Sequence, residues 1–387
     1  MNSKQFETAK MCLKVVTPIN IADGIVLGAK DYLYDSRRQK VYFLNLHQWH
    51  LFIYKHMLLE KYESYLANFR DKQSLLEWLR MQGYDIDDVR TVITSEAQAT
   101  VNLMDSERKK TLNDISRHIQ QPDGSLYVPG SSIKGVFRTA ILYSLLQKRQ
   151  DIKVKYWRQI QEKISSNYFK PYRDFNKLIS DLENELLHTL LLLDGNIRSN
   201  NALCSAMRGL QVSDTYASRN MQTAILQKVD GGFDKFGKAS PKKLPIFREC
   251  MLPEAELFFD VKIEKAVMNT IAINSVDDLL KATHSFFAAV TDLLQQAFGK
   301  EYQEAFQGVA AGNMFLGGNT GFLSKTLLAM LAPDKDTAKN TIKVLLDKSF
   351  KTHKHLLRDK IIAPRTLKCT NYNGKLMLMG VAEVRKV

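Results

Sequence analysis

The sequence predicts an α+β fold in two domains, on the basis of three observations. Its 387 residues are enough for about two domains, each with a hydrophobic core of its own. Its hydrophobic and charged fractions, 45% and 25%, are ordinary for a globular protein. Segments with the periods of strands and helices follow one another irregularly, without the regular alternation of a doubly wound sheet. We therefore expect two modules, residues 1–200 with helical insertions and residues 201–387 with a glycine-rich loop.

In the first module the sequence predicts short strands followed mainly by helices. A hairpin is expected where the turn-forming residues 35–39 separate two β-like runs. No clear stop signal occurs between residue 47 and Gln121-Pro122-Asp123-Gly124, so this stretch is expected to be mainly helical. The expected elements are strands at residues 10–16, 31–34, 40–46 and 126–128, and helices over residues 47–120, from residue 130 onward, and over residues 145–200.

In the second module several strands precede two helices. The clearest strand covers residues 256–264, where every second residue from Leu257 to Ile263 is apolar. A long helix is expected after Ser275, because Ser275 and Asp278 have the spacing of a capping box. The expected elements are strands at residues 209–213, 223–229, 245–251, 256–264 and 375–384, helices over residues 275–298 and from 324, a Gly/Lys-rich loop at 230–243, and a glycine-rich loop at 312–321.

The charge balance points to a polyanionic partner. The formal net charge is +14 and the isoelectric point is near 9.4. Such an excess of Lys and Arg concentrates polyanions, usually nucleic acid and less often an anionic membrane. The excess is greatest in the second half, where residues 341–387 hold 11 Lys and Arg against three Asp and Glu. Lys235 and Lys238 of the Gly/Lys-rich loop add to it.

Other features of the sequence exclude several classes of protein. No run of about 18 apolar residues is present, and the first residues lack an apolar signal core, so we expect a cytoplasmic protein with no membrane partner. The four cysteines are dispersed without a CxxC pair, which argues against a zinc site and a disulfide framework. We accordingly expect no metal and no cofactor. An anionic-membrane binder would fit the charge but would need a basic amphipathic helix with aromatic anchors.

A Pro-Gly turn leads into the helix that holds the first candidate phosphate site. Ser131 or Ser132 can cap this helix, which would direct its first N–H groups at an anion. Lys134 and Arg138 are four residues apart and should lie together off the buried face. Gly135 leaves room for the backbone of a ligand. An ordinary turn into a capped helix explains the same residues equally well.

The glycine-rich loop is the second candidate site. It matches neither nucleotide-binding fingerprint, because Lys325 stands four residues after Gly321 and the glycine order differs. It would still present backbone N–H groups just before a helix, which suits an anion. A connector between packed helices is an equally open alternative. The candidate residues here are Gly317, Gly318, Asn319, Thr320, Gly321 and Lys325.

The candidate catalytic groups are four histidines and one aspartate, and none of them has the sequence context of a catalytic residue. His47 and His50 lie near a strand-to-helix junction, and His353 and His355 lie in the basic tail, without a matching carboxylate motif. Asp23 beside a glycine is more typical of a turn than of a catalytic acid. We therefore expect no catalytic residue, and keep a metal-independent endoribonuclease as the alternative.

Six motifs follow one another along the chain: Thr17-Pro-Ile-Asn-Ile-Ala-Asp-Gly, Pro129-Gly-Ser-Ser-Ile-Lys-Gly-Val-Phe-Arg-Thr-Ala, Leu210-Gln-Val-Ser-Asp, Pro245-Ile-Phe-Arg-Glu-Cys, Gly321-Phe-Leu-Ser-Lys-Thr and Ala363-Pro-Arg-Thr-Leu-Lys. Together they resemble one family, the RAMP (repeat-associated mysterious protein) superfamily of CRISPR systems. Within it the chain is similar to the subunit at the crRNA 3′ end of the type III-A (Csm) effector complex. The resemblance covers nearly the whole chain in order.

The resemblance implies ferredoxin-like (RRM-like) modules with large insertions. It implies a non-catalytic subunit that binds the 3′ region of crRNA, caps the filament of a repeated backbone subunit, and contributes to crRNA maturation and antiviral defence. Its partners would be crRNA, the type III-A backbone RAMP subunit and other Csm subunits, with a host nuclease as a further candidate. Related RAMP proteins include nucleases, which keeps the endoribonuclease alternative open. The expected RNA-binding residues are Asn20, Gly24, Ser131, Ser132, Lys134, Gly135, Arg138, Lys235, Lys238, Gly317, Gly318, Asn319, Thr320, Gly321, Lys325 and Arg365.

One departure from the family pattern concerns the glycine-rich loop. The typical loop has an aromatic or basic residue among its glycines, whereas residues 316–321 offer mostly backbone. We therefore expect this loop to contact phosphates through its N–H groups rather than to stack on bases.

Overall fold

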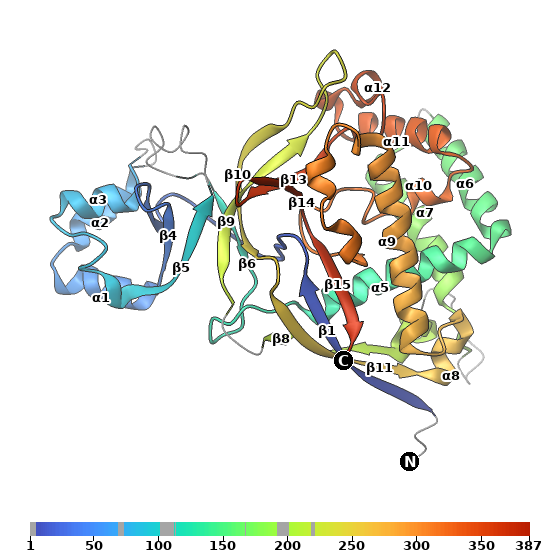
Figure 1. The fold of residues 1–387 in the computed structure, drawn as a ribbon, viewed down its shortest axis with the longest axis horizontal. Coiled ribbons are helices and arrows are strands. Elements are labelled where there is room, and N and C mark those ends of the chain that lie inside the picture. Colours follow the sequence, from blue (N-terminus) through green and yellow to red (C-terminus); the bar gives the residue numbers. More distant parts are fainter. Residues whose placement is uncertain are drawn as a thin grey trace.

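The structure is a computed structural model that describes residues 5–68, 73–100, 112, 114–166, 168–191, 201–217 and 221–387. Its strands are β1 (Phe6–Val15), β2 (Ala22–Leu27), β3 (Tyr32–Asp35), β4 (Lys40–Leu44), β5 (Ile93–Thr100), β6 (Ile115–His118), β7 (Leu210–Val212), β8 (Tyr216–Ala217), β9 (Thr223–Gly231), β10 (Lys242–Met251), β11 (Glu256–Glu264), β12 (Met314–Phe315), β13 (Leu367–Tyr372), β14 (Lys375–Leu378) and β15 (Val381–Lys386). Its α-helices are α1 (Leu46–Lys55), α2 (Leu59–Ala67), α3 (Leu75–Met81), α5 (Gly130–Lys148), α6 (Gln150–Ser165), α7 (Pro171–Leu187), α8 (Lys265–Met268), α9 (Val276–Phe298), α10 (Leu328–Leu331), α11 (Lys335–Ser349) and α12 (His355–Arg358). Figure 1 shows α1–α3 at one end of an elongated molecule, most other helices at the opposite end, and the sheets between them.

One sheet has a ferredoxin-like core. Its strands follow the order β12-β15-β1-β11-β7, with β8 also paired to β11, and the pairs are antiparallel. Helix α5 lies between β1 and β7 in the chain, and α9 lies between β11 and β15. This order of strands and helices is that of the β-α-β-β-α-β ferredoxin-like motif. The predicted α+β class is confirmed.

Alternation along the central strands builds the main core. Met11, Leu13 and Val15 of β1 are fully buried, and they belong to the same cluster as Phe259 of β11. Phe137 of α5 belongs to that cluster too, so the helix packs on the sheet through the apolar face that its spacing predicts. The sheet therefore fixes where α5 begins and which side it turns to solvent.

The second sheet follows the order β2-β6-β10-β9-β5-β4-β3, with β13 paired to β9 and β14 paired to β13. Strands β9 and β10 form a long hairpin that rises to the top of the view in Figure 1. Both sheets contain strands from before residue 192 and after residue 200, and the boundary predicted near residue 200 falls beside residues 192–200, which lie outside the described residues. The division into two modules remains a prediction.

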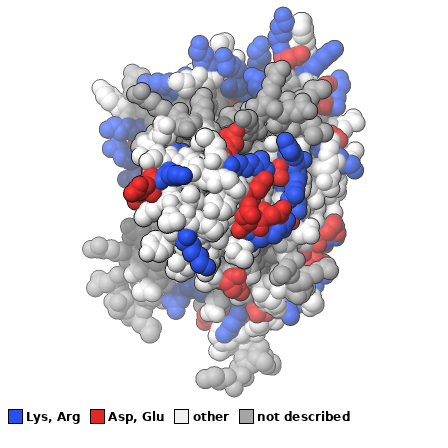
Figure 2. Space-filling model, turned by 90° about the vertical axis from the view of Figure 1, so that its left-hand side faces the viewer, with Lys and Arg blue, Asp and Glu red and all other residues white. Residues whose placement is uncertain are grey.

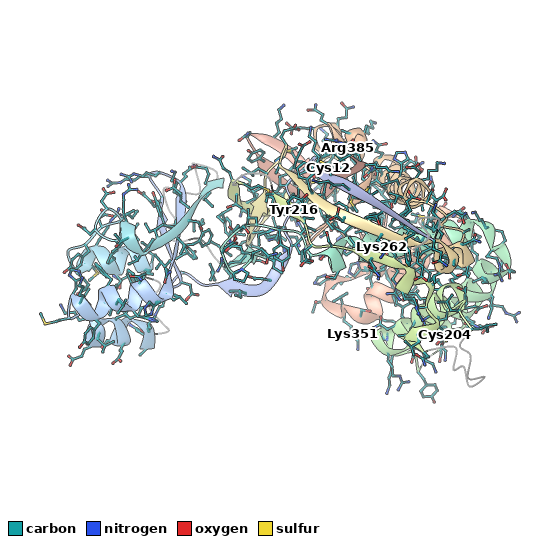
Figure 3. All side chains as sticks on the ribbon, turned by 90° about the horizontal axis from the view of Figure 1, so that it is seen from below. Cys12, Cys204, Tyr216, Lys262, Lys351 and Arg385 are labelled. Atoms are coloured by element: carbon teal, nitrogen blue, oxygen red, sulfur yellow. The ribbon has the colours of Figure 1, made fainter. Side chains whose placement is uncertain are left out.

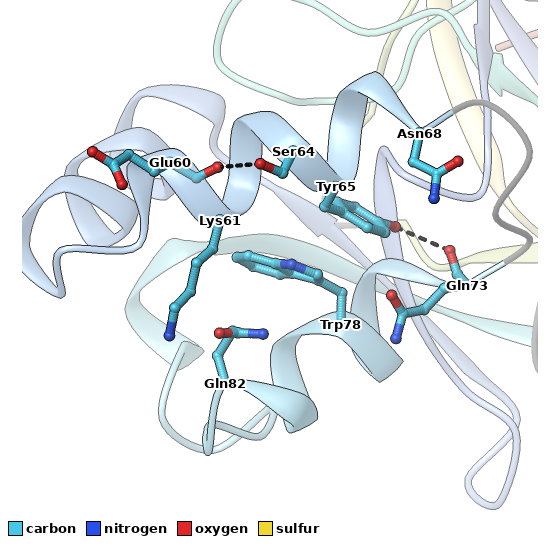
Figure 4. A pocket seen from close by; sticks show the side chains of 8 residues that line it. All are labelled: Glu60, Lys61, Ser64, Tyr65, Asn68, Gln73, Trp78 and Gln82. Atoms are coloured by element: carbon cyan, nitrogen blue, oxygen red, sulfur yellow. Dashed lines mark hydrogen bonds between the residues drawn. The ribbon is translucent and has the colours of Figure 1, made fainter.

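A lobe formed by α1–α3 extends this second sheet and has a hydrophobic core of its own around Trp49 and Trp78. Viewed end-on, the middle of the lobe surface is largely uncharged, with Lys, Arg, Asp and Glu around it (Figure 2). A polar hollow of about 450 Å³ lies between α2 and α3 (Figure 4). Beside it the Tyr65 and Trp78 rings stack with centroids 5.4 Å apart, and the Tyr65 hydroxyl donates to the Gln73 carbonyl at 3.1 Å.

Several predicted elements need correction. The stretch 47–120 is not helical throughout, because its described residues include β5 and β6 as well as α1–α3. Residues 69–72, 101–111 and 113 of this stretch lie outside the described residues. The sequence of β5 is largely polar, and β5 is stabilised by pairing with β4 and with the distant β9. Residues 126–128 make only an isolated bridge through Leu126, and the helix expected from residue 324 starts at Leu328.

Candidate nucleic-acid interface

The glycine-rich loop connects β12 to the turns before α10 and is held by backbone bonds at both ends. The Leu316 N–H donates to the Gly380 carbonyl at 2.7 Å, and the Gly318 N–H donates to the Asn20 carbonyl at 2.6 Å. At the far end the Ser324 hydroxyl donates to the carbonyls of Thr320 and Gly321, each at 3.1 Å. The loop is therefore a fixed part of the structure, as a preorganised binding site requires.

The backbone of this loop needs glycine at one position above all. Gly317 has a φ of +86°, and a Cβ atom there would lie 2.4 Å from the Asn20 carbonyl oxygen. Asn319 and Gly321 also have positive φ values, +61° and +94°. These turns leave the N–H groups of Gly317, Asn319, Thr320 and Gly321 without an acceptor in the part of the chain that the structure describes. Such N–H groups can bind an anion.

Asn20 is a support of the loop. It is fully buried, and its side-chain amide donates to the Glu249 carbonyl at 2.8 Å. Its side-chain oxygen accepts from Arg248 Nη1 at 3.1 Å, while its backbone carbonyl holds Gly318. The residue predicted to contact RNA therefore positions both the loop and an arginine beside it.

A cleft of about 300 Å³ lies between the loop and α5, with Gly317, Gly318 and Lys325 on the loop side. The α5 side presents Ser132, Gly135 and Thr139, which are three to four residues apart and so share a face of the helix. A Cβ atom at Gly135 would meet nothing within 4 Å, so the helix backbone is open to the cleft. The structure thus brings together the two candidate sites that the sequence places almost 200 residues apart.

The predicted cap of α5 is wrong. Pro129 is the N-cap, the helix begins at Gly130, and neither Ser131 nor Ser132 makes a capping bond. Instead the Gly130 N–H donates to the Asp214 carboxylate at 2.7 Å. The chain's own carboxylate thus occupies the place that we had expected an anionic ligand to take.

Lys134 and Arg138 are also turned away from the cleft. Lys134 is half-buried, its Nζ donates to the Leu210 carbonyl at 2.6 Å, and burial lowers the pKa of its ammonium group. Arg138 pairs with Glu183 of α7. Both cations lie off the buried face, as predicted, but they bind neighbouring elements of the protein.

Other cations surround the loop in their place. Lys325 is exposed at the cleft, and its ammonium group has no hydrogen-bond or ion-pair partner among the described residues. Desolvation by the surrounding protein lowers the pKa of Lys325, and repulsion from Arg248 lowers it further. Lys228 and Lys368 share the single carboxylate of Asp230, at 3.7 and 2.9 Å. Desolvation lowers the pKa of Lys228, and the positive charges of Lys368 and Arg248 add to the effect.

This cation cluster was only partly visible in the sequence. Lys325 was predicted, but Arg248, Lys228 and Lys368 were noted only as members of motifs or of a basic stretch. The sequence signal for Arg248 is that Arg248 and Glu249 stand side by side between apolar residues of a strand, Phe247 on one side and Cys250 and Met251 on the other. The structure shows that Glu249 is buried there.

The remaining predicted RNA-binding residues lie elsewhere. Lys235 and Lys238 are at the exposed tip of the β9–β10 hairpin, where the Lys235 ammonium lies 4.8 Å from the Phe236 ring centroid. Gly24 is an exposed position of β2 with a φ of +92°. Arg365 pairs with the fully buried Asp359 at 2.7 Å, which gives it a structural role.

The candidate catalytic groups do not come together. His47 and His50 are exposed on α1, and His353 and His355 lie side by side near α12 with ring centroids 5.7 Å apart. The Asp23 carboxylate accepts from the Ile25 N–H at 2.7 Å, as a turn-forming aspartate does. Within the described ranges, no three His, Cys, Asp or Glu side chains lie close enough to hold a metal ion, and no helix is long and apolar enough to cross a membrane.

Known proteins with similar sequences and folds cover almost the whole chain. A family model described as the RAMP superfamily matches residues 12–320. A Mycobacterium tuberculosis H37Rv protein named "CRISPR system Cms protein Csm5" is 26% identical over 98% of this chain and 97% of its own length. A protein of the same name from Enterococcus italicus is 23% identical over 88% of this chain and 85% of its own length.

Two solved structures share the fold. One is a chain of the cryo-EM structure of a Csm–crRNA–target RNA ternary complex of a type III-A CRISPR-Cas system, with a TM-score of 0.65 and 17% identity over 98% of this chain and 100% of that one. The other is the crystal structure of T. onnurineus Csm5, with a TM-score of 0.58 and 19% identity over 96% of this chain and 99% of that one. At these identities the likeness concerns the fold.

Proposed function

The chain belongs to the RAMP superfamily, and on that premise we propose that it is the RNA-binding subunit of a type III-A CRISPR ribonucleoprotein that holds the 3′ region of crRNA and caps the backbone filament. The names of its relatives support this assignment, as does the type III-A complex among the structures that share its fold. Its partners are crRNA, the backbone RAMP subunit and other Csm subunits. A host nuclease as a further partner, and a cytoplasmic location, stay predictions.

The observation that carries the proposal is the cleft between the glycine-rich loop and α5. Gly317 and Gly318 line the loop side of the cleft and Ser132 and Gly135 line the helix side, so a nucleic-acid backbone can approach both sides closely. The Gly317 N–H has no acceptor among the described residues. Gly135 and Ser132 leave the helix side open, and the loop contributes donors rather than aromatic rings. Contacts of this kind fix the path of a strand but do not read its bases.

The charge around the loop supports phosphates as the ligand. Arg248 and Lys325 have no carboxylate partner in the described part of the chain, and Lys228 and Lys368 share one. Desolvation is the main reason that the pKa values of Lys325 and Lys228 are lowered, and repulsion from neighbouring cations, Arg248 for both and Lys368 for Lys228, lowers them further. A bound phosphate would supply the missing negative charge. Each neutralised phosphate of a single strand would also make affinity fall with salt, by a slope of about 0.7 per contact.

The test measures the affinity of a fluorescent crRNA for the purified chain, with Lys325→Ala as the variant and Lys134→Ala as its matched control. Hydrogen bonds to charged groups contribute about 1.5–3 kcal/mol, so Lys325→Ala should weaken binding roughly 10- to 100-fold. It should also reduce the salt slope by about 0.7. The control removes a lysine whose Nζ is already bonded to Leu210, so RNA affinity should change little.

Three further measurements complete the test. Arg248→Ala should weaken binding in the same way, with thermal melting used to check that the loop it supports has stayed folded. Scrambling the guide sequence should leave affinity almost unchanged, since backbone contacts carry no sequence information. A photoreactive group at the crRNA 3′ end, and not one at the 5′ end, should label this chain in the assembled complex. Equal losses in Lys325→Ala and Lys134→Ala, or labelling from the 5′ end, would contradict the proposal.

A further inference from the structure

A basic and apolar surface lies after α11, at residues 350–361, here called the 350–361 segment. Its exposed cations are Lys351, Lys354, Arg358 and Lys360. Its exposed large apolar side chains are Phe350, Leu356, Leu357 and Ile361, with exposed fractions of 42%, 51%, 70% and 51%. Figure 3 labels Lys351 at the edge of the helical part, away from Arg385 and Cys12 on the six-stranded sheet. The 350–361 segment therefore combines positive charge with exposed apolar side chains.

The carboxylates near these cations are bonded to other groups of the protein. Asp359 is fully buried and is bonded to Arg365 at 2.7 Å and to His355 Nδ1 at 2.8 Å. Asp347 accepts the Leu356 N–H at 3.1 Å. Lys351, Lys354, Arg358 and Lys360 consequently have no ion pair within the described residues. The surface therefore carries positive charge that no ion pair among the described residues neutralises.

These bonds also hold the surface in shape. Asp359 links His355 at the start of α12 to Arg365 beyond it, and Asp347 ties α12 to the end of α11. Leu356 and Leu357 are therefore exposed from a fixed helical turn. A partner that binds there would therefore lose little free energy to the ordering of loops and side chains.

The chain continues from this segment into an apolar cleft of about 150 Å³. Ile361 lines the cleft together with aliphatic side chains that include Leu323 and Ile342. Lys335 and Lys339 also line the cleft, but each is paired with a carboxylate, Asp292 at 3.4 Å and Asp336 at 2.8 Å, so the unpaired positive charge belongs to the 350–361 segment. An apolar cavity of this volume can take a benzene-sized group, so one large apolar side chain of a partner would fit.

From these features we infer that the 350–361 segment and the adjoining cleft bind an acidic segment of another protein in the same ribonucleoprotein, which inserts one large apolar side chain into the cleft. Its carboxylates pair with the unpaired cations, and its apolar side chains cover Leu356 and Leu357. RNA would satisfy the cations but would leave these leucines and the cleft exposed. The inference rests on the proposed function for the identity of the assembly.

The test places a photo-crosslinking benzoylphenylalanine at Leu357 and irradiates living cells before the ribonucleoprotein is purified through a tag on this chain. We expect an adduct with a protein subunit of the complex. The matched control carries the crosslinker at Val154 of α6, which is equally exposed at 66% and should give no such adduct. An adduct with RNA, an adduct with a protein absent from the complex, or no adduct at Leu357 would overturn the inference.

Charge reversal gives a second, quantitative arm. Lys351→Glu with Arg358→Glu should reduce the Leu357 adduct at least tenfold. Lys55→Glu with Lys61→Glu, on the lobe at the other end of the molecule, makes the same change in net charge and should leave the adduct unchanged (Figure 1). Affinity of the isolated chain for crRNA is measured in parallel. A failure of the proposed function would appear as lost RNA binding in the parent protein, whereas a failure of this inference would leave RNA binding intact and the adduct absent or insensitive to charge.

Discussion

Lowering the pH from 7 to 5 should destabilise this protein through one buried histidine, His118. Its Nδ1 accepts the Ile21 N–H at 3.2 Å, and its Nε2 lies 3.1 Å from the Tyr127 carbonyl. Nδ1 can accept only while the ring is neutral. The side chain is fully buried, and this burial lowers the pKa of His118 from 6.5 to about 4. Ile21 lines the cleft and Tyr127 precedes α5, so the histidine joins both sides of the candidate site.

The sign follows from which state binds the proton first. As the pH falls below about 6.5, the unfolded chain protonates His118 while the folded protein does not, so the free energy of unfolding decreases. The decrease continues until the pH passes the folded pKa near 4. With 1.36 kcal/mol per pKa unit, the loss at pH 5 is about 2 kcal/mol. Burial of Glu249 raises the pKa of that carboxyl, so its protonation stabilises the fold on acidification and offsets part of the loss.

Urea unfolding at pH 7 and pH 5 measures the effect. His118→Gln cannot titrate, so the variant should start less stable at pH 7 but should lose no further stability at pH 5. His50→Gln, which removes an exposed histidine, should keep the pH dependence of the parent. A parent protein equally stable at both pH values, or an unchanged pH dependence in His118→Gln, would refute this account of the buried ring.

Three other predictions follow from the site. Gly317→Ala should abolish crRNA binding, because the new Cβ atom would lie 2.4 Å from the Asn20 carbonyl oxygen. Gly321→Ala should weaken binding less, because Gly321 also has a positive φ but the nearest atom to its Cβ, a Lys368 side-chain carbon, lies 3.5 Å away. Equal crRNA affinities of the two variants would contradict the role of the close contact at Gly317. Arg138→Ala should lower the melting temperature modestly and change RNA affinity less than twofold, since the side chain pairs with Glu183 away from the cleft; a large loss of affinity would restore it as an RNA ligand. The pure chain should not cleave labelled crRNA with or without divalent metal; cleavage that disappears in Asp23→Ala or His50→Ala would make it an enzyme, because acid–base help is worth about 10²–10⁴-fold.

The elements predicted most closely are those that a short stretch of sequence specifies by its apolar alternation or by its capping residues. The strand at residues 256–264 has the same bounds in the structure, because its alternating apolar residues specify one buried face. The helix after Ser275 begins as expected, with the Ser275 hydroxyl accepting the Asp278 N–H at 3.1 Å. Strand β5 was missed because its stability comes from pairing with β9, more than 100 residues away. Nothing in its own residues specifies that pairing.

The candidate site shows the same limit. Gly135 and the glycine-rich loop were predicted because glycine at such positions indicates close approach or unusual backbone. Asn20 lies beside the loop, and its support of Gly318 and Arg248 depends on contacts that the sequence does not specify. The partners of Lys134 and Arg138, Leu210 and Glu183, lie 45 or more residues away and were not predictable from helical spacing.

The place of β1 in its sheet has a consequence for synthesis. β1 precedes the other described strands in the chain, yet both of its neighbours in the sheet come late: Phe6 pairs with Glu264, and Val15 pairs with Ala382. A ribosome adds ~5–20 residues per second, so β1 emerges roughly 10–50 s before β11 and longer before β15. During that time its row of apolar residues has no native partner in the sheet. Deletion of the last few residues should therefore leave a nascent chain whose central strand has one open edge, a ready substrate for chaperones.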